Sequence, residues 1–362
     1  MASRATCKLL ALAVLALVTG GAKAAPPTRG PFPVTNANFV AKALDASDAT
    51  VWVHYPICAN ASCPKFPLIS YVHGADGGDI DLLGAFSAMA SPVAPSRHAT
   101  LHAALKPPIL SRAPAGYAHH FEQLASYGFI VAAPDSCSVG CTDKSGGAPW
   151  TDCAEGLAPE GLWAPWFGEQ LKTIDFMRNN SLRNASAPDF FRAIDWDAGV
   201  GIAGHSMGGQ ASTVSASAAC AAQWGIRAAA LIHPAAGDLP GGRSSGANMS
   251  VPTAAFTSTG DHLCAPASVA ATMRAFNASA AGQALPSLYR NVQGWSHLEP
   301  VMGAAFENPL LATFTAAWFK VFLNKARAGD PYYDLIFSGS PDSICRAEAM
   351  EECYVLPNGA GA

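Results

Sequence analysis

The sequence has few charged residues and no excess of positive charge. Asp, Glu, Lys and Arg make up only 13% of its 362 residues, whereas 50% are apolar. This balance excludes a disordered acidic or basic chain, because the apolar surface is large enough to offset the entropy lost on folding. The 22 Lys and Arg residues face 26 Asp and Glu residues. A chain without a cationic excess is a poor binder of phosphate backbones, so we expect no nucleic-acid partner.

Motifs for cofactors and membrane spans are also missing. No C-x2-C pair occurs and no cysteine pair is accompanied by H-x3-5-H, which argues against a zinc site. The glycine-rich turn Gly74 to Gly78 matches neither G-x-G-x-x-G nor G-x4-G-K, so it does not predict a bound nucleotide. After the first 24 residues no stretch approaches the length of a transmembrane helix. We therefore expect no cofactor, no metal and no transmembrane segment.

The first 24 residues have the three-part pattern of a secretory signal peptide. Arg4 and Lys8 precede an apolar run from Leu9 to Val18, and the small-residue triplet Ala22-Lys23-Ala24 follows. Ten apolar residues cover about half of a bilayer core, which makes an uncleaved anchor the weaker interpretation. Cleavage after Ala24 would leave 19 cations against 26 acids, a net charge of -7. The pattern predicts a secreted protein.

Nine cysteines remain after the predicted cleavage, and in an oxidising compartment most of them should pair. Close spacing predicts local disulfides within three groups: Cys58/Cys63, Cys137/Cys141/Cys153 and Cys345/Cys353. An odd number leaves one thiol, and we expect this to be Cys220, which lies in an Ala/Ser-rich segment typical of a buried helix. Five glycosylation acceptor sequences agree with secretion; they begin at Asn60, Asn179, Asn184, Asn248 and Asn277.

Short apolar runs alternate with helix-like segments along most of the chain. Strands are predicted at 50–55, 67–73, 129–133, 199–204, 228–233, 253–259 and 288–292, the first two paired with each other, and helices at 117–127, 166–178 and 210–220. This alternation predicts an α/β fold, with a largely parallel sheet covered by helices on both faces. We divide the chain into a signal peptide (1–24), a lead-in (25–49), the α/β domain (50–330) and a loop-like tail (331–362) pinned by Cys345 and Cys353.

Two long segments interrupt this rhythm. Residues 85–115 contain five prolines and no clear period, and residues 136–165 contain three cysteines and five glycines. Long irregular segments in a compact domain are often functional, so each is a candidate wall or lid of a binding pocket. Each of the two segments can equally well be a surface insertion that has no functional role.

The clearest chemical signal is Gly204-His205-Ser206-Met207-Gly208. It follows a predicted strand and opens a predicted helix, the setting of a nucleophilic serine on a sharp strand-to-helix turn. Glycines two residues before and two after the serine let the flanking backbone pass without Cβ clashes. Ser206 is therefore the candidate nucleophile, and the amide of Met207 is a candidate oxyanion donor.

A serine hydroxyl needs a base, and the base needs an orienting carboxylate. Where the nucleophilic serine sits on such a strand-to-helix turn of a parallel sheet, the chain order is Ser, acid, His, and each of the three residues lies on a loop after a strand. His297 follows the last predicted strand and is the candidate base. Asp261, after the penultimate strand, is the favoured acid, with Asp238, one strand earlier, as its competitor. The remaining histidines are assigned no chemistry: His205 packs beside the serine, His233 ends a strand, and His262 adjoins the acid.

An earlier strand ends in Tyr71-Val72-His73-Gly74-Ala75-Asp76. The loop after this strand supplies the second oxyanion donor in this architecture. The amide of Ala75 is the preferred candidate, and that of Asp76 is the alternative.

These residues together resemble the α/β-hydrolase superfamily, and within it the branch of chlorophyllases and cutinase-like polyester hydrolases. The similarity covers residues 50–330 and is carried by His73-Gly74, the segment 124–135 (LASYGFIVAAPD), Gly204 to Gly209, Gly260-Asp261 and Ser296-His297. It implies an eight-stranded, mostly parallel sheet and a serine esterase that works through an acyl-enzyme. Small-molecule, lipid-like and polyester esters are all compatible substrates.

Some positions depart from both parts of that branch. Met207 is similar to the polyester hydrolases, where chlorophyllases typically carry arginine; Ala75 and Ala235-Ala236 lack the aromatic residues with which polyester hydrolases hold an aromatic acyl unit. The sequence thus predicts a secreted carboxylic ester hydrolase without naming its ester. An acyltransferase with the same triad, or an inactive binding protein on the same scaffold, stay open as alternatives.

Overall fold

The structure is a computed structural model of the chain. It describes residues 29–41, 49–58, 64–74, 115–135, 153, 164–235, 245–301 and 308–357. The predicted signal peptide lies outside these residues, as do most of the two irregular segments 85–115 and 136–165.

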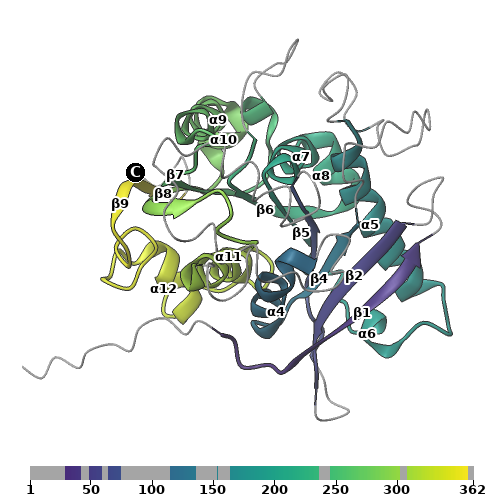
Figure 1. The fold of residues 1–362 in the computed structure, drawn as a ribbon. Helices are drawn as coiled ribbons and strands as arrows, with labels where there is room; N and C mark the ends of the chain where they lie inside the picture. The colour runs from purple at the N-terminus through teal and green to yellow at the C-terminus, as the bar shows by residue number, and fades with distance from the viewer. Residues whose placement is uncertain are drawn as a thin grey trace, which may run out of the picture.

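A nine-stranded sheet runs through the centre of the molecule, in the order β1-β2-β4-β3-β5-β6-β7-β8-β9 (Figure 1). The strands from β3 to β8 are mutually parallel, whereas β1, β2 and β9 join the two sides of the sheet in antiparallel pairs. Their bounds are Val34–Ala41 (β1), Ala49–Pro56 (β2), Leu68–Val72 (β3), Ile130–Pro134 (β4), Val200–His205 (β5), Ile226–Ile232 (β6), Thr253–Gly260 (β7), Ser287–Ser296 (β8) and Met350–Leu356 (β9).

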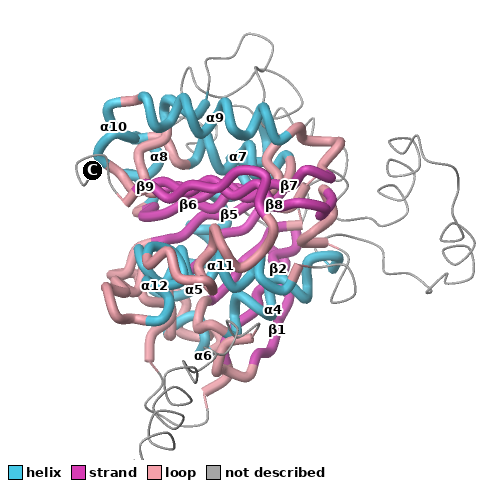
Figure 2. The backbone as a smooth tube through the Cα atoms, turned by 90° about the vertical axis from the view of Figure 1, so that its left-hand side faces the viewer, coloured by secondary structure: helices cyan, strands magenta, loops and turns pink. Residues whose placement is uncertain are grey.

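Helices cover both faces of this sheet, as the edge-on view shows (Figure 2). The described helices are Ala118–Ser126 (α4), Ala164–Leu182 (α5), Asp189–Arg192 (α6), Met207–Ser215 (α7), Ala218–Trp224 (α8), Pro266–Ala278 (α9), Ala280–Ala284 (α10), Pro309–Phe322 (α11) and Pro331–Phe337 (α12), with short 3-10 turns at Ala115–Tyr117 and Ser245–Asn248. Helices α7, α8 and α9 lie over one face, and α4, α11 and α12 over the other (Figure 1).

The two helical layers enclose two hydrophobic cores. Alternate side chains of a strand point to opposite faces, so neighbours such as Leu68 and Ile69 on β3 belong to different cores. Leu171 of α5 packs in the first core, and Trp318 of α11 packs, fully buried, in the second. The predicted α/β fold with a mostly parallel sheet is confirmed.

The strand count differs from the eight that the resemblance implies. Strand β1 forms inside the segment interpreted as a lead-in, and β9 pairs with β8 inside the tail interpreted as a loop. The predicted pairing of 50–55 with 67–73 is also wrong, since β4 lies between β2 and β3. These differences concern long-range strand pairing, which local patterns do not encode.

Local boundaries were easier to predict. Every predicted strand corresponds to an observed one, and the helices at 117–127 and 166–178 appear as α4 and α5. The predicted helix 210–220 is interrupted at Ala216, so that α7 and α8 are separate.

Disulfides correct two expectations, the identity of the free thiol and the local pairing of Cys153 with Cys137 or Cys141. Cys345 is bonded to Cys353, as predicted, but Cys220 is bonded to Cys153 and is not the free thiol. Cys58 is also in a disulfide, and Cys63, Cys137 and Cys141 lie outside the described residues. Within the described residues, the free cysteine is Cys264, which is buried.

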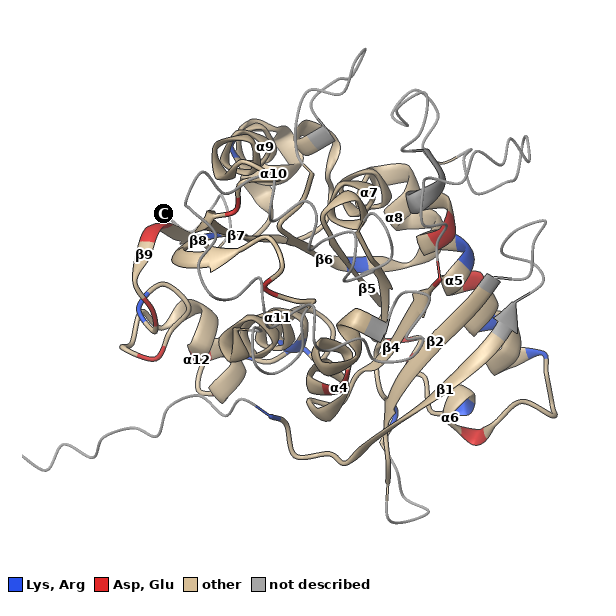
Figure 3. Ribbon diagram, viewed as in Figure 1, with Lys and Arg blue, Asp and Glu red and all other residues tan. Residues whose placement is uncertain are grey.

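The charge distribution of the described part of the chain agrees with the composition. Charged residues are scattered along the ribbon and do not gather in a band of one sign (Figure 3). Among the helices described, we find none that combines the length and apolar character needed to cross a bilayer.

Candidate active site

The predicted site residues meet at the carboxyl edge of the parallel strands. Each of them is the first residue after its strand: Ser206 after β5, His233 after β6, Asp261 after β7 and His297 after β8. The carboxyl ends of parallel neighbours lie at one edge of a sheet, which is why residues far apart in the sequence converge there.

Ser206 occupies a strained turn between β5 and α7. Its φ of 56° and ψ of −119° place a residue with a side chain in a region that favours glycine. Its carbonyl accepts hydrogen bonds from the amides of Gln210 (3.1 Å) and Ala235 (2.8 Å), and its own amide donates to Ile232 (3.0 Å). These three bonds stabilise the turn, so the serine is held at its tip.

The glycines around this turn are required by close backbone contacts. A Cβ atom on Gly204 would lie 2.2 Å from the carbonyl oxygen of Gly208, and one on Gly208 would lie 2.0 Å from that of Val72. Gly74, after β3, packs so closely that its Cβ would lie 3.0 Å from Cβ of Ser206. The loop after β3 therefore begins directly against the serine.

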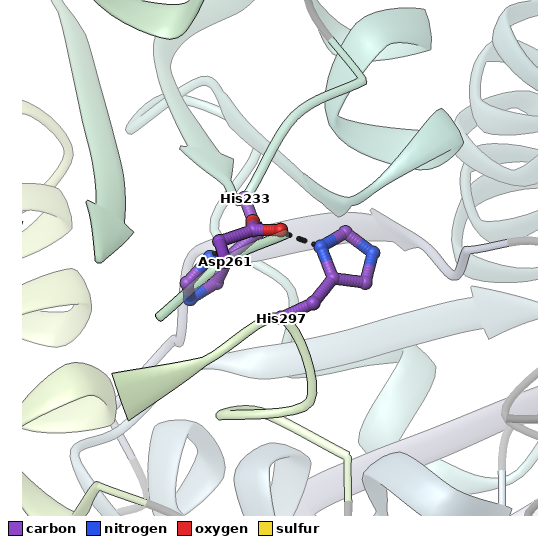
Figure 4. A group of neighbouring side chains, drawn as sticks. All are labelled: His233, Asp261 and His297. Carbon is purple, nitrogen blue, oxygen red and sulfur yellow. Dashed lines mark hydrogen bonds and ion pairs between the residues drawn. The ribbon is translucent and has the colours of Figure 1, made fainter. Parts of the chain in front are cut away.

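Asp261 and His297 form a buried pair. Nδ1 of His297 lies 2.9 Å from Oδ2 of Asp261, and the other ring nitrogen points away from the carboxylate (Figure 4). The other oxygen, Oδ1, accepts bonds from the amides of Leu263 (3.0 Å) and Cys264 (2.7 Å). The carboxylate is thus fixed in orientation, and among the described residues nothing bonds the second ring nitrogen of His297, which leaves it for a reacting group.

A second histidine shares the same carboxylate. Nδ1 of His233 lies 2.9 Å from Oδ2 of Asp261, and its Nε2 lies 2.8 Å from Oε2 of Glu299. Both side chains of the His233–Glu299 pair are buried, and φ of His233 is 43°, a second strained backbone position at this edge. Arg290 of β8 lies 3.7 Å from the other oxygen of Glu299.

A separate hydrogen-bonded chain of neutral groups lies next to this ionic group. The amide of Gly74 donates to the hydroxyl of Tyr117 (3.0 Å), which lies 2.6 Å from Nδ1 of His205; Nε2 of His205 lies 2.8 Å from the carbonyl oxygen of His297. A carbonyl only accepts, so Nε2 carries the proton and the tyrosine hydroxyl donates to Nδ1. This chain joins the loops after β3, β5 and β8.

Burial and neighbouring charges set the protonation of the ionic groups. Burial and the two nearby histidines hold the pKa of His205 well below its usual 6.5. Burial alone would lower the pKa of His233, but its hydrogen bonds to Asp261 and Glu299 raise it to about 9. Burial opposes ionisation of Asp261 as well, yet the two histidines hold its pKa well below the usual 3.8. Burial and the charge of His233 lower the pKa of His297, against the effect of Asp261.

Cys264 lies beside the serine. Its thiol shares a hydrogen bond with the Ser206 hydroxyl, and burial followed by the charge of Asp261 raises its pKa to about 12. A protonated thiol is a weak nucleophile, so in this environment Cys264 serves as a neighbour of Ser206 and not as a rival to it.

His233, Asp261 and His297 also present ligand atoms within 4.8 Å of one another, which is close enough to hold a cation. However, both nitrogens of His233 face carboxylate oxygens, and carboxylates only accept hydrogen bonds. Each nitrogen is therefore used as a donor, without a lone pair for a metal. We interpret the group as a hydrogen-bonded array.

The structure thus brings together Ser206, Met207, Asp261 and His297. Met207 is the first residue of α7, where backbone amides have no partner within the helix. Ala75, Asp76 and the competing acid Asp238 lie outside the described residues. Sequence reasoning missed the roles of His233, Glu299 and Tyr117; the position of Glu299, two residues after His297, was the one available signal.

The arrangement suits nucleophilic chemistry at a serine backed by an imidazole and a carboxylate. A scan against protein-family models and a search of the curated proteins both found no match. The assignment of this site therefore depends on its geometry.

Proposed function

We propose that the protein is a secreted serine hydrolase of the α/β-hydrolase type that cleaves carboxylic esters. The observation that carries this proposal is the strained serine at the tip of the β5–α7 turn, with the His297–Asp261 pair at the same sheet edge. The order Ser, Asp, His after β5, β7 and β8 is the chain order of that architecture.

In the proposed reaction, Oγ of Ser206 attacks the ester carbonyl while Nε2 of His297 takes the hydroxyl proton. The C–O bond to the alcohol breaks, and the imidazolium returns the proton to the leaving alcohol. Water, deprotonated by His297, then attacks the acyl-enzyme and releases the acid and the free serine. Asp261 keeps Nδ1 of His297 protonated and stabilises the imidazolium that forms.

The developing oxyanion needs two donors. The amide of Met207 at the start of α7 is the first. In the loop after β3, Gly74 packs against Ser206, which supports the amide of Ala75, the next residue, as the second donor. The hydroxyl of Ser206 turns from Cys264 to His297 in this scheme, as catalytic hydrogen bonds commonly form only with substrate present.

The rim supports an ester with apolar parts. Leu263, two residues after the acid, is 46% exposed, and Trp295, two residues before the base, is half-buried. Apolar side chains around a few polar groups are typical of small-molecule sites. Disulfides within the described residues support an oxidising compartment, and hence secretion.

The test is Ser206→Ala against Ser215→Ala, a serine at the other end of α7. We expect Ser206→Ala to lose at least about 10³-fold in turnover of a chromogenic ester while folding normally, and Ser215→Ala to keep it. A fluorophosphonate should label wild type on Ser206 only. Turnover by Ser206→Ala contradicts the proposal, and absence of labelling favours an inactive binding protein. Ester products formed with an added alcohol identify an acyltransferase.

A further inference from the structure

His233 has a protonation state that its partners dictate. Its two nitrogens each lie within 2.9 Å of a carboxylate oxygen, one from Asp261 and one from Glu299. Carboxylates can only accept, so both nitrogens carry hydrogen and the ring is an imidazolium. A buried cation of this kind is retained only where charges compensate it.

The compensation extends through a row of charged groups that are buried except for the partly buried Glu348. Asp261, Glu299 and Glu348 are negative, and His233 and Arg290 are positive, so the row carries a net charge of -1. Asn308 donates to Glu348 (2.7 Å) at its far end. When His297 takes a proton the sum becomes zero. The row is therefore matched to the charged form of the base that the reaction creates.

We propose that His233 and Glu299 are positioning residues of this active site: a permanent imidazolium at His233 fixes Asp261 and weakens the basicity of His297, and Glu299 holds that imidazolium in place. The inference deepens the proposed function and rests on it. His233 is a positioning and not a catalytic residue in this account, since it acts on the reacting atoms only through Asp261 and His297.

Backbone strain at His233 supports a functional role. Among the described residues with a side chain, positive φ occurs at Ser206, His233 and Lys325, and the first two belong to this site. Such conformations cost of order 1–3 kcal/mol and persist where surrounding structure imposes them. Here the amide of His233 bonds the carbonyl of Phe256 on β7 (2.8 Å), which directs the ring toward the acid.

The effect of His233 on the protonation of His297 depends on all the charged and titratable groups around His233. Asp261 and Glu299 contact it, the rings of His297 and His205 have their centroids 5.8 and 6.1 Å away, and Arg290 is one group further. The positive charge on His233 opposes a second positive charge on His297. Removing this charge should make His297 easier to protonate. As the pH is lowered, the variant should therefore lose activity at a higher pH than wild type does.

The main experiment compares His233→Gln with wild type in the pH dependence of kcat/KM. We expect the acidic limb to move up by about one pH unit, the size typical of a lost neighbouring charge. Glu299→Gln keeps the His233 ring but removes the negative charge that stabilises the proton on its Nε2. This variant should move the acidic limb in the same direction by a smaller amount. His262→Gln, at an exposed histidine next to Asp261 in the chain, should leave the limb unchanged.

Nuclear magnetic resonance of the histidine rings gives a readout that needs no turnover. In wild type at pH 7.5, both nitrogens of His233 should be protonated, and Glu299→Gln should convert the ring to a neutral tautomer. A neutral His233 in wild type, or a folded His233→Gln with an unmoved acidic limb, overturns the inference. If fluorophosphonate does not label Ser206, the proposed function fails and the positioning role fails with it, whatever the ring spectra show.

Discussion

Two buried histidines at the candidate site, His205 and His233, have ring centroids only 6.1 Å apart and yet hold different charges, one neutral and one positive. The partners of His205 are the Tyr117 hydroxyl and a carbonyl oxygen, and its pKa is held well below 6.5. The partners of His233 are two carboxylates, and its pKa is raised to about 9. Burial is the same for both, so the hydrogen-bond partners decide the charge.

The surroundings of His297 therefore have two parts. The neutral part consists of Tyr117 and His205, and the ionic part consists of Asp261, His233 and Glu299. The neutral part binds the backbone of His297 through its carbonyl, and the ionic part binds its ring through Asp261. Backbone position and basicity are thereby controlled by different residues. Substitutions on the two sides should therefore change different observables.

The largest effect is expected where the ionic part meets the base. Asp261→Asn replaces the carboxylate that both His297 and His233 contact, which leaves the base in the wrong tautomer and the imidazolium without one partner. A fall in kcat on the order of 10⁴-fold is expected for loss of a triad carboxylate. Steady-state kinetics on a chromogenic ester measures it.

Asp238→Asn is the control for this experiment, since Asp238 is the competing acid by sequence. It should cost far less activity than Asp261→Asn. The reverse order would assign the acid to Asp238 and detach the His233–Glu299 row from catalysis.

The convergence of Ser206, Asp261 and His297 at one sheet edge could be predicted because each of them follows a strand that local patterns identify. Ser206 has glycines at fixed spacing, and Asp261 and His297 follow the last two predicted parallel strands. The ionic row could not be predicted, because Glu299 and Arg290 become neighbours of His233 only once β6 and β8 flank β7. Local propensity carries no information on such long-range partners.

Errors in the fold have the same origin. Strands β1 and β9 are outer members of the sheet, and their half-exposed residues give weaker apolar patterns than the buried β3 to β7. The wrong choice of Cys220 as free thiol followed from assuming local disulfides, whereas its partner Cys153 lies 67 residues away. Sequence spacing does not limit which cysteines meet in a folded chain.

A second effect should appear in stability. Since folding raises the pKa of His233 from 6.5 to about 9, the stabilisation it gives is complete below pH 6.5 and is lost as the pH rises through 9. The stability difference between wild type and His233→Gln should therefore shrink by about 3 kcal/mol over this window, as an upper bound. Urea unfolding at several pH values measures it; a constant difference would contradict an imidazolium at His233.

His54 provides the matched control. His54 lies on β2 and is buried against Phe121 of α4, and burial lowers its pKa from 6.5 to about 4. The unfolded chain therefore binds more protons than the folded protein between these values, and stability rises with pH there. His54→Gln should change the pH dependence below pH 6.5 and leave the window from 6.5 to 9 as in wild type.

The smallest effect is expected on the neutral side. Tyr117→Phe removes the hydroxyl between the Gly74 amide and Nδ1 of His205, leaving two buried polar groups unpaired. Unfolding free energy should fall by about 2 kcal/mol, and kcat should drop because the loop after β3 loses an anchor, but the acidic limb should stay in place since no charge changes. Tyr127→Phe, which removes a bond to Thr313 away from the site, should cost stability without lowering kcat. A limb displaced by Tyr117→Phe as far as by His233→Gln would show that the two sides are electrostatically coupled and not separate.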